Sequence, residues 1–257
     1  MHIEPLAILS GFVVGLIVGL TGVGGGSLMT PLLIGAFRLA PALAIGTDLW
    51  FAAITKSSGV WAHYRLEHID FRVVRLMLAG SLPAAVATLA ALHWFSLTKR
   101  WSEAVTLILG IALLLTALSV AFRPAWAALG VRMERHLPER RKALITLLAG
   151  ALLGVLVSLT SIGGGAIGAT FLLLLYPRLP TPRIVGTDIA HAVPLTIVAA
   201  AGHASLGHVH WALLAALLIG SLPGIWLGAS LTRLMPERFV RTALCLSLVG
   251  ASFKVVT

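Results

Sequence analysis

The chain has 257 residues, of which 58% are hydrophobic and only 11% are charged. Because soluble domains carry about 25% charged residues, this composition excludes an ordinary soluble protein and also a disordered or collagen-like chain. The formal net charge is +10, but the basic residues lie in short gaps between long apolar runs. Such gaps are typical of loops in a multi-pass membrane protein, not of a nucleic-acid-binding surface.

Apolar segments follow one another along the whole chain, and most are long enough to cross a bilayer, which takes about 20 helical residues. Two neighbouring pairs are shorter, and each pair is joined by a glycine-rich break, at 21–26 and at 160–165. In chain order the segments are 5–20, 27–37, 41–63, 72–96, 102–122, 143–158, 165–176, 184–204, 211–231 and 237–253. The pattern predicts an all-α polytopic membrane protein.

The second half of the chain repeats the first. The three glycines at 24–26 match those at 163–165, 139 residues later, and Gly-Thr-Asp at 46–48 matches Gly-Thr-Asp at 186–188 with an offset of 140. The same offset relates His63 to His203, His68 to His208, and Gly-Ser-Leu-Pro at 80–83 to the same sequence at 220–223. We therefore expect two transmembrane repeats, 5–122 and 143–256, joined by a basic linker, 123–142.

The distribution of Lys and Arg predicts the orientation of the repeats. If each glycine-broken pair is a hairpin that returns to its own face, fourteen of the 19 basic residues lie on one side and four on the other, with Lys56 inside a segment. If each pair is one span, the split is ten to eight. Since cytoplasmic loops carry the excess of Lys and Arg, the hairpin arrangement is favoured. Each repeat then has a hairpin and three spans, so the second repeat is inverted, the linker is cytoplasmic, and both termini are extracytoplasmic in a bacterial-type inner membrane.

The glycine breaks predict an anion site. A break frees backbone N–H and C=O groups that hydrocarbon cannot satisfy. The helix after each break begins with N–H groups and the positive end of a helix dipole, so two such ends near the midplane would bind an anion. Close helix packing is the alternative use of glycine. The expected substrate-binding residues are Gly24, Gly25, Gly26 and Ser27 from the first break, and Gly163, Gly164, Gly165 and Ala166 from the second.

These motifs resemble the sulfite exporter TauE/SafE family. The resemblance is carried by the stretch 19–27 followed by Pro31, by its partial copy at 160–165 and by the two Gly-Thr-Asp motifs, and it covers nearly the whole chain. It implies an anion permease that exports sulfite or organosulfonates. The second copy departs from the first, since Ser161 replaces Gly22, Ala166 replaces Ser27, and no proline matches Pro31. The two halves of the site are therefore chemically unequal, and the anion is left open.

Polar residues within the segments have two interpretations. Asp48 and Asp188 are expected to cap the helices that follow, or else to carry protons along the path. Thr47 and Thr187 are candidates for direct contact with the anion. Lys56 is a cation within an apolar segment, which indicates a functional charge or a side chain that snorkels to the interface. His63, His203 and His191 rank below the glycines and are candidate pH sensors.

Export is the function that these features favour. A dianion that leaves a negative cytoplasm gains about 2.3 kcal/mol per charge per 100 mV. Because no paired, buried carboxylates are evident, we expect uncoupled or weakly coupled export. The alternatives are a channel or permease for another small anion and an intramembrane enzyme, although no catalytic constellation, metal-ligand cluster or cofactor motif stands out. The expected partners are the small anion and the bilayer, without nucleic acid. Gly11, Gly15 and Gly19 would suit a homodimer interface or packing within one protomer.

Overall fold

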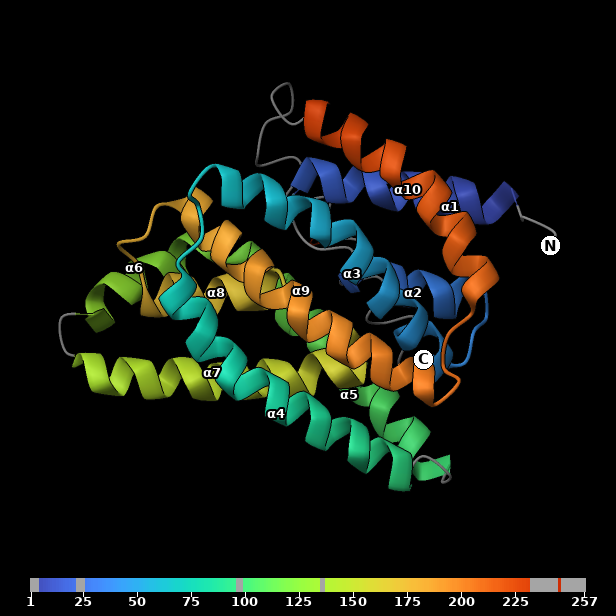
Figure 1. Ribbon diagram of the computed structural model, residues 1–257, viewed down its shortest axis with the longest axis horizontal. Helices are drawn as coiled ribbons and strands as arrows, with labels where there is room; N and C mark the ends of the chain where they lie inside the picture. The colour runs from blue at the N-terminus through green and yellow to red at the C-terminus, as the bar shows by residue number, and fades with distance from the viewer. Residues whose placement is uncertain (1–4, 22–25, 96–98, 135–136, 232–244, 246–257) are drawn as a thin grey trace.

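The computed structural model describes residues 5–21, 26–95, 99–134, 137–231 and 245, and its regular structure there is entirely helical (Figure 1). Five helices are long and apolar enough to cross a membrane: α4, α5, α7, α9 and α10. The predicted segment 237–253 lies outside the described residues apart from Cys245. The helices are α1 (Pro5–Thr21), α2 (Gly26–Gly35), α3 (Pro41–Arg65), α4 (Phe71–Phe95), α5 (Lys99–Ala121), α6 (Arg123–Glu134), α7 (Glu139–Thr160), α8 (Ala166–Leu175), α9 (Thr181–Ser205) and α10 (Trp211–Leu231).

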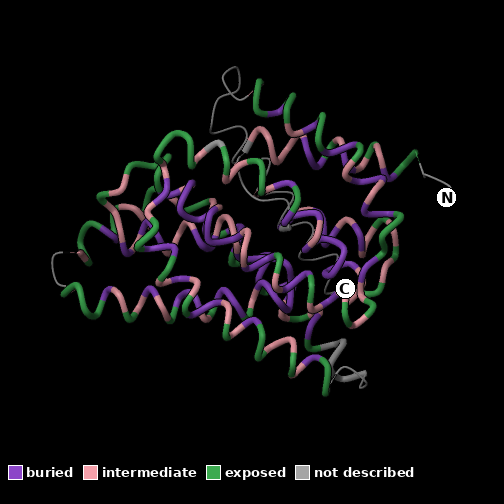
Figure 2. Tube along the Cα trace, in the orientation of Figure 1, coloured by how far each residue is buried: buried purple, intermediate pink, exposed green. Residues whose placement is uncertain are grey.

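The outward sides of these helices are apolar. Leu107, Ile111 and Leu118 of α5 are about half exposed, as are Leu144 and Leu148 of α7. Figure 2 shows that buried residues follow the facing sides of the helices and are densest on α3 and α9 in the centre. Large apolar faces are rarely exposed to water in soluble proteins. This pattern, together with the long apolar helices, is that of a membrane protein.

Two boundaries differ from the prediction. The predicted short segment 143–158 is part of α7, which begins at Glu139 and is long enough to cross a membrane by itself. An apolar criterion misses its first residues because they are charged, although Pro138 and Glu139 suit a helix start. The linker 123–142 contains a helix, α6, which packs on α8 through Gly130. Lys142 is buried there, 3.7 Å from Glu134 and 4.4 Å above the Tyr176 ring.

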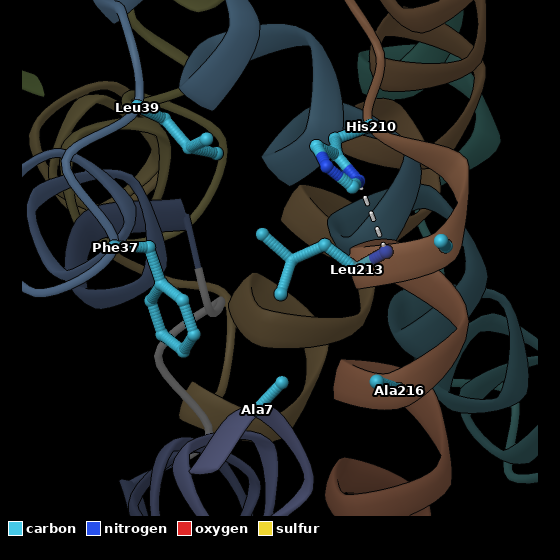
Figure 3. A pocket seen from close by; sticks show the side chains of 7 residues that line it. Ala7, Phe37, Leu39, His210, Leu213 and Ala216 are labelled. Carbon is cyan, nitrogen blue, oxygen red and sulfur yellow. Dashed lines mark hydrogen bonds between the residues drawn. The ribbon is translucent and has the colours of Figure 1, made fainter. Parts of the chain in front are cut away.

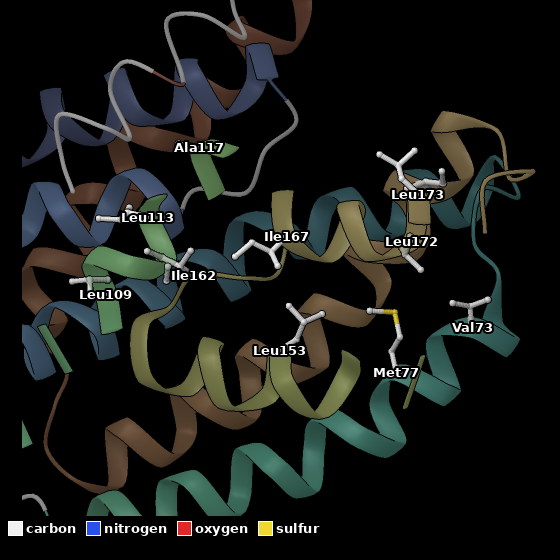
Figure 4. Close-up of a cluster of buried hydrophobic side chains, with 12 residues drawn as sticks. Val73, Met77, Leu109, Leu113, Ala117, Leu153, Ile162, Ile167, Leu172 and Leu173 are labelled. Carbon is white, nitrogen blue, oxygen red and sulfur yellow. The ribbon is translucent and has the colours of Figure 1, made fainter. Parts of the chain in front are cut away.

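The helix pairs recur with the two halves exchanged. α1 packs on α10, and α4 packs on α7. In the register of the repeat, α1 corresponds to α7 and α10 corresponds to α4. The two pairs are therefore equivalent: in each, the first helix of one repeat packs on the equivalent of α4 from the other repeat. Figure 1 shows the two pairs on opposite sides of the molecule, with α3 and α9 between them. A cluster of apolar side chains joins α4, α5, α7 and α8 (Figure 4), and a second joins α1, α2, α3 and α10.

Glycines allow the backbones of these pairs to touch. Gly11, Gly15 and Gly19 of α1 lie against the backbone of α10, at Leu217, Ser221 and Ile225 in that order. The numbers rise together, so the two helices run parallel. The three glycines are therefore used for packing within the protomer, one of the two uses expected from the sequence, and a homodimer stays a prediction.

The equivalent glycines of α7 make the equivalent contacts. Gly150 and Gly154 lie against Met77 and Ser81 of α4, again in rising order. These residues are related to those of the α1–α10 pair by offsets of 139 and 140. Both pairs thus have the same register and the same parallel direction.

The ends of α3 and α9 meet the opposite half in matched ways. Gly46 lies against the backbone carbonyl of His208, and Gly186 lies against that of His68. The beginning of each helix therefore touches the turn after the other, so α3 and α9 run antiparallel. The His63 and His68 rings are 5.6 Å apart between centroids, and the His203 and His208 rings are 5.6 Å apart as well.

Candidate functional site

The two buried aspartates lie within helices, not at their starts. α3 begins at Pro41 and α9 at Thr181, seven residues before Asp48 and Asp188 respectively. The expectation that these aspartates cap helices is therefore wrong. The prolines Pro41 and Pro182 supply the helix starts instead, because proline is well suited to the first turn. Asp48 is 0% and Asp188 is 3% exposed, so both carboxyl groups are enclosed by protein.

Asp48 has a hydrogen-bond partner from the short helix α2. Its Oδ2 accepts from the Thr30 hydroxyl, and Ser161, in the break between α7 and α8, lies near the same carboxyl group. Asp188 lacks this partner, since the position equivalent to Thr30 is Ala169. Its Oδ1 is buried and accepts no hydrogen bond from any residue that the structure describes. The two aspartates, identical in the sequence motif, therefore differ in environment.

Lys56 reaches the break between α7 and α8. Its Nζ donates to the backbone carbonyl of Gly164 at 2.5 Å, and Asp188 and Asp48 both attract it electrostatically. Neither carboxylate is among the ion pairs within 4.0 Å that the described part of the chain forms. Since the ammonium group binds a carbonyl inside the protein, it does not snorkel to a membrane surface. The position equivalent to Lys56 in the second repeat is Thr196, whose hydroxyl donates to the Ala192 carbonyl within its own helix.

Each glycine of the second break has its own physical requirement. Gly163 has φ 133° and Gly165 has φ 145°, a backbone conformation that favours glycine. Gly164 is required by space, since a Cβ there would lie 2.9 Å from the Ala192 Cβ and 3.6 Å from the Lys56 Nζ. α8 then begins at Ala166, and its first turn is closed by bonds from Gly168 N to Gly163 O at 2.9 Å and from Ala169 N to Gly165 O at 2.8 Å.

The first break is described only in part. Gly24 and Gly25 lie outside the described residues. Gly26 is the first residue of α2, and Ser27, which follows it, is 5% exposed. The start of α2 thus matches the start of α8, and the two helices pack on α3 and α9 respectively.

Asp188 packs directly on the first turn of α8. Its Oδ1 lies so close to the Gly168 Cα that a Cβ at that position would overlap it. Lys56, Gly164, Asp188 and the start of α8 therefore form one cluster, to which Asp48 contributes from the other half; we call these residues the central cluster.

The two predicted contact threonines lie outside the central cluster. Thr47 Oγ1 accepts from His210 N at 3.0 Å and donates to Leu43 O at 2.7 Å. Thr187 Oγ1 accepts from Asp70 N at 2.9 Å. Both side chains are fully buried, and each satisfies the backbone where α10 or α4 begins. These bonds are structural, and they are again equivalent between the halves.

The predicted histidines occupy three different environments. His191 is 0% exposed, and its Nε2 lies 3.0 Å from the Ser81 hydroxyl of α4. His203 is also buried and lies 2.9 Å from the Ser158 carbonyl through Nε2. His63 is half-buried beside His68. Sequence reasoning did not select Thr30 or Ser81; for Ser81 the repeated Gly-Ser-Leu-Pro motif was a usable signal.

A separate pocket lies between α1, the turn after α2, and α10 (Figure 3). It has a volume of about 180 Å³, and the residues that line it include Ala7, Phe37, Leu39 and Leu213. His210 lies at its edge and accepts from Leu213 N at 3.2 Å. None of the lining residues belongs to the central cluster. Among the described residues, no three His, Cys, Asp or Glu side chains group together as metal ligands.

Comparison with known proteins gives a consistent result. The model of the family described as "Sulfite exporter TauE/SafE" matches residues 7–255. "Probable membrane transporter protein YjnA" of Bacillus subtilis is 40% identical over 228 residues, which cover 88% of this chain and 89% of the relative. "Probable membrane transporter protein YdhB" of the same organism is 26% identical, with 94% and 96% covered. No solved structure matches the chain. With its family match and its long apolar helices, the chain belongs to the sulfite exporter TauE/SafE family of membrane transporters.

Proposed function

We propose that this transporter exports small sulfur oxyanions, sulfite or organosulfonates, from the cytoplasm. The observation that carries the proposal is the Lys56 ammonium group, which donates to Gly164 O just before a helix start. A cation and the N–H groups of a helix start attract an anion together. The family's description supplies the class of substrate.

The anion would bind between Lys56 and the first turn of α8. There the N–H groups at Gly165 and Ala166 precede the first intrahelical bonds of α8, and the bond from Lys56 to Gly164 O would be exchanged for one to the anion. The equivalent start of α2, at Gly26 and Ser27, would complete the site from the other half. We keep Gly24 and Gly25 in this proposal because they match Gly163 and Gly164. Thr47 and Thr187 have less support as contacts, since their hydroxyls already bind backbone groups.

We further propose that repeats 5–122 and 143–256 are inverted in the membrane, around the cytoplasmic linker 123–142. The antiparallel course of α3 and α9 and the exchanged glycine contacts support inversion. The Arg72–Glu139 and Arg178–Glu134 ion pairs join helix ends on one side of the molecule. These helix ends carry more Lys and Arg than the helix ends on the opposite side. Nine basic residues lie at these ends: Arg65, Arg72, Arg75, Arg132, Arg140, Arg141, Lys142, Arg178 and Arg183. The excess supports a cytoplasmic position for these ends in an inner membrane, with both termini outside.

Labelling of the two equivalent turns tests this orientation. In a Cys245→Ser background, a membrane-impermeant maleimide is expected to label Leu206→Cys in intact cells and to label Leu66→Cys only after lysis. The two positions are 140 residues apart and follow the ends of α9 and α3, so each is the control for the other. Labelling of both from the same side would contradict inversion.

Transport by a Gly164→Ala variant tests the anion site. The added Cβ would contact the Ala192 Cβ at 2.9 Å and crowd the Lys56 Nζ, so we expect sulfite efflux from proteoliposomes under an imposed potential to fall about tenfold or more, as a displaced binding group costs about 1.4 kcal/mol or more. Gly59→Ala is the matched control on α3, since its Cβ would meet only Ile189 atoms at 3.7 Å and beyond. Equal fluxes for the two variants would refute a site at this break. If the unaltered protein moves no sulfite, organosulfonate or sulfate, the exporter proposal is wrong.

A further inference from the structure

We propose that Asp188 binds a proton that is transported together with the anion. The proposal rests on the anion site proposed above and adds a second ligand to it. It starts from a difference between the two Gly-Thr-Asp motifs. The Oδ1 atoms of Asp48 and Asp188 are both buried and accept no hydrogen bond from the described residues, but Asp48 accepts one from Thr30 through Oδ2, whereas the position equivalent to Thr30 beside the second motif is Ala169.

The surroundings of Asp188 favour a protonated state whenever an anion is present. A buried carboxylate with an oxygen that accepts no hydrogen bond is costly, and a nearby cation is its main compensation. That cation is Lys56, which also compensates Asp48. With both carboxylates ionised, the central cluster carries one positive and two negative charges. An arriving anion adds negative charge, and a proton on Asp188 restores the balance.

No other charge in the central cluster offers this compensation. From α3, Lys56 is the charged group that acts on Asp188, and the same ammonium group also attracts Asp48. On α9 itself, His191 lies one turn further along, where its Nε2 is engaged with Ser81 of α4. The residues that the break and α8 bring to Asp188 and Lys56 are uncharged: Gly168 lies against Asp188 Oδ1, and Gly164 lies by Lys56. Anion and proton therefore bind cooperatively, and each raises the affinity for the other by the same factor.

The transport step balances as follows. On the side where the anion binds, an Asp188 oxygen takes a proton from water and an O–H bond forms. On the side where the anion leaves, that O–H bond breaks and the proton returns to water. The charge moved per cycle is one unit less negative than the anion alone. The uncoupled export expected from the sequence rested on the lack of paired, buried carboxylates, and the structure brings two of them to Lys56.

Difference infrared spectroscopy on the whole purified protein tests the proton site directly. A carbonyl stretch of a protonated carboxylic acid is expected to grow when sulfite is added, to disappear as the pH is raised without sulfite, and to be missing in Asp188→Asn. Asp70→Asn is the matched control, because Asp70 is a carboxylate that caps α4, away from the central cluster, and asparagine keeps the cap. Asp48→Asn is the second variant, and it is expected to keep the band. Absence of the band from the unaltered protein at every pH would overturn the proposal whether or not sulfite is transported.

Flux measurements separate this proposal from the proposed function. In proteoliposomes with a pH dye inside, sulfite entry is expected to bring one proton per anion. Sulfite itself also changes the internal pH by buffering, and the pH change at an equal sulfite flux through Asp188→Asn measures that contribution, which is subtracted. Asp188→Asn is expected to move sulfite at a rate that no longer follows pH. If sulfite moves with the same proton count and pH dependence in both proteins, the proton proposal is wrong and the exporter proposal stands.

Discussion

Replacing Lys56 by glutamine is expected to lower sulfite transport about a hundredfold or more at a fixed subsaturating concentration. Two unit charges about 4 Å apart attract by about 4 kcal/mol at an effective dielectric constant of about 20, and each 1.4 kcal/mol corresponds to about a tenfold change in binding. Desolvation of the two charges offsets part of this attraction. The remaining effect is still expected to be large, because Lys56 places its ammonium group directly at the break before α8.

The second repeat provides the control for this prediction. Thr196 is the equivalent of Lys56, and its hydroxyl donates to Ala192 within α9, so Thr196→Ala is expected to leave the flux within about twofold, since a satisfied local hydroxyl contributes only about 1 kcal/mol. Lys56→Arg keeps the charge and is expected to retain part of the flux. A Lys56→Gln protein that folds and transports sulfite at the rate of Thr196→Ala would contradict a role for this charge.

Removal of Lys56 also leaves two buried carboxylates without their cation. Part of the lost activity could then come from lost stability, because breaking a buried charge pair is strongly destabilising. The double variant Lys56→Gln with Asp188→Asn returns the central cluster to the net charge of the unaltered protein, with Asp48, which accepts from Thr30, as the remaining carboxylate. We expect it to recover the thermal stability of the folded protein but not the flux, and recovery of both would mean that Lys56 serves only to compensate the aspartates.

The sequence predicted the architecture better than it predicted the chemistry. Apolar segment lengths and the offset of 139–140 identified nine of the described helices, since both depend on local composition and on identities between the halves. α6 was missed because its composition is mixed. Lys56 was found because a charge in an apolar segment is conspicuous, and the break at 163–165 because glycine runs are.

The partners of these residues could not be read from the chain. Asp48 bonds to Thr30, 18 residues away, and Lys56 bonds to Gly164, 108 residues away. Both contacts depend on how helices cross in space. The motif Gly-Thr-Asp is identical in both halves, but the second repeat has Ala169 at the position equivalent to Thr30. Because alanine has no hydroxyl to donate, the environment of Asp188 differs from that of Asp48. The role of Thr47 and Thr187 depends in the same way on the turns that α10 and α4 bring to them.

Replacing Gly80 by alanine is expected to destabilise the protein by about 2–3 kcal/mol, the cost of overpacking a tight contact. A Cβ at Gly80 of α4 would overlap the Leu147 carbonyl and lie 2.9 Å from the Ala151 N. Both obstacles are backbone atoms of α7, so no side-chain rotation relieves them and the two helices must separate. The equivalent Gly220 of α10 meets Ile8 and Phe12 of α1 in the same way, and Gly220→Ala is expected to cost a similar amount.

The matched control reverses the sign of the effect. Alanine is a better helix former than glycine by about 1 kcal/mol, and Gly59 of α3 has room for a Cβ, with Ile189 as its neighbour at 3.7 Å. Gly59→Ala is therefore expected to leave the midpoint of thermal unfolding in detergent unchanged or higher, whereas Gly80→Ala and Gly220→Ala lower it. The two sites lie in different helix pairs, so their effects should add. If all three substitutions raised the midpoint alike, helix propensity would outweigh packing, and the parallel glycine contacts between α4 and α7 and between α1 and α10 would not hold the repeats together.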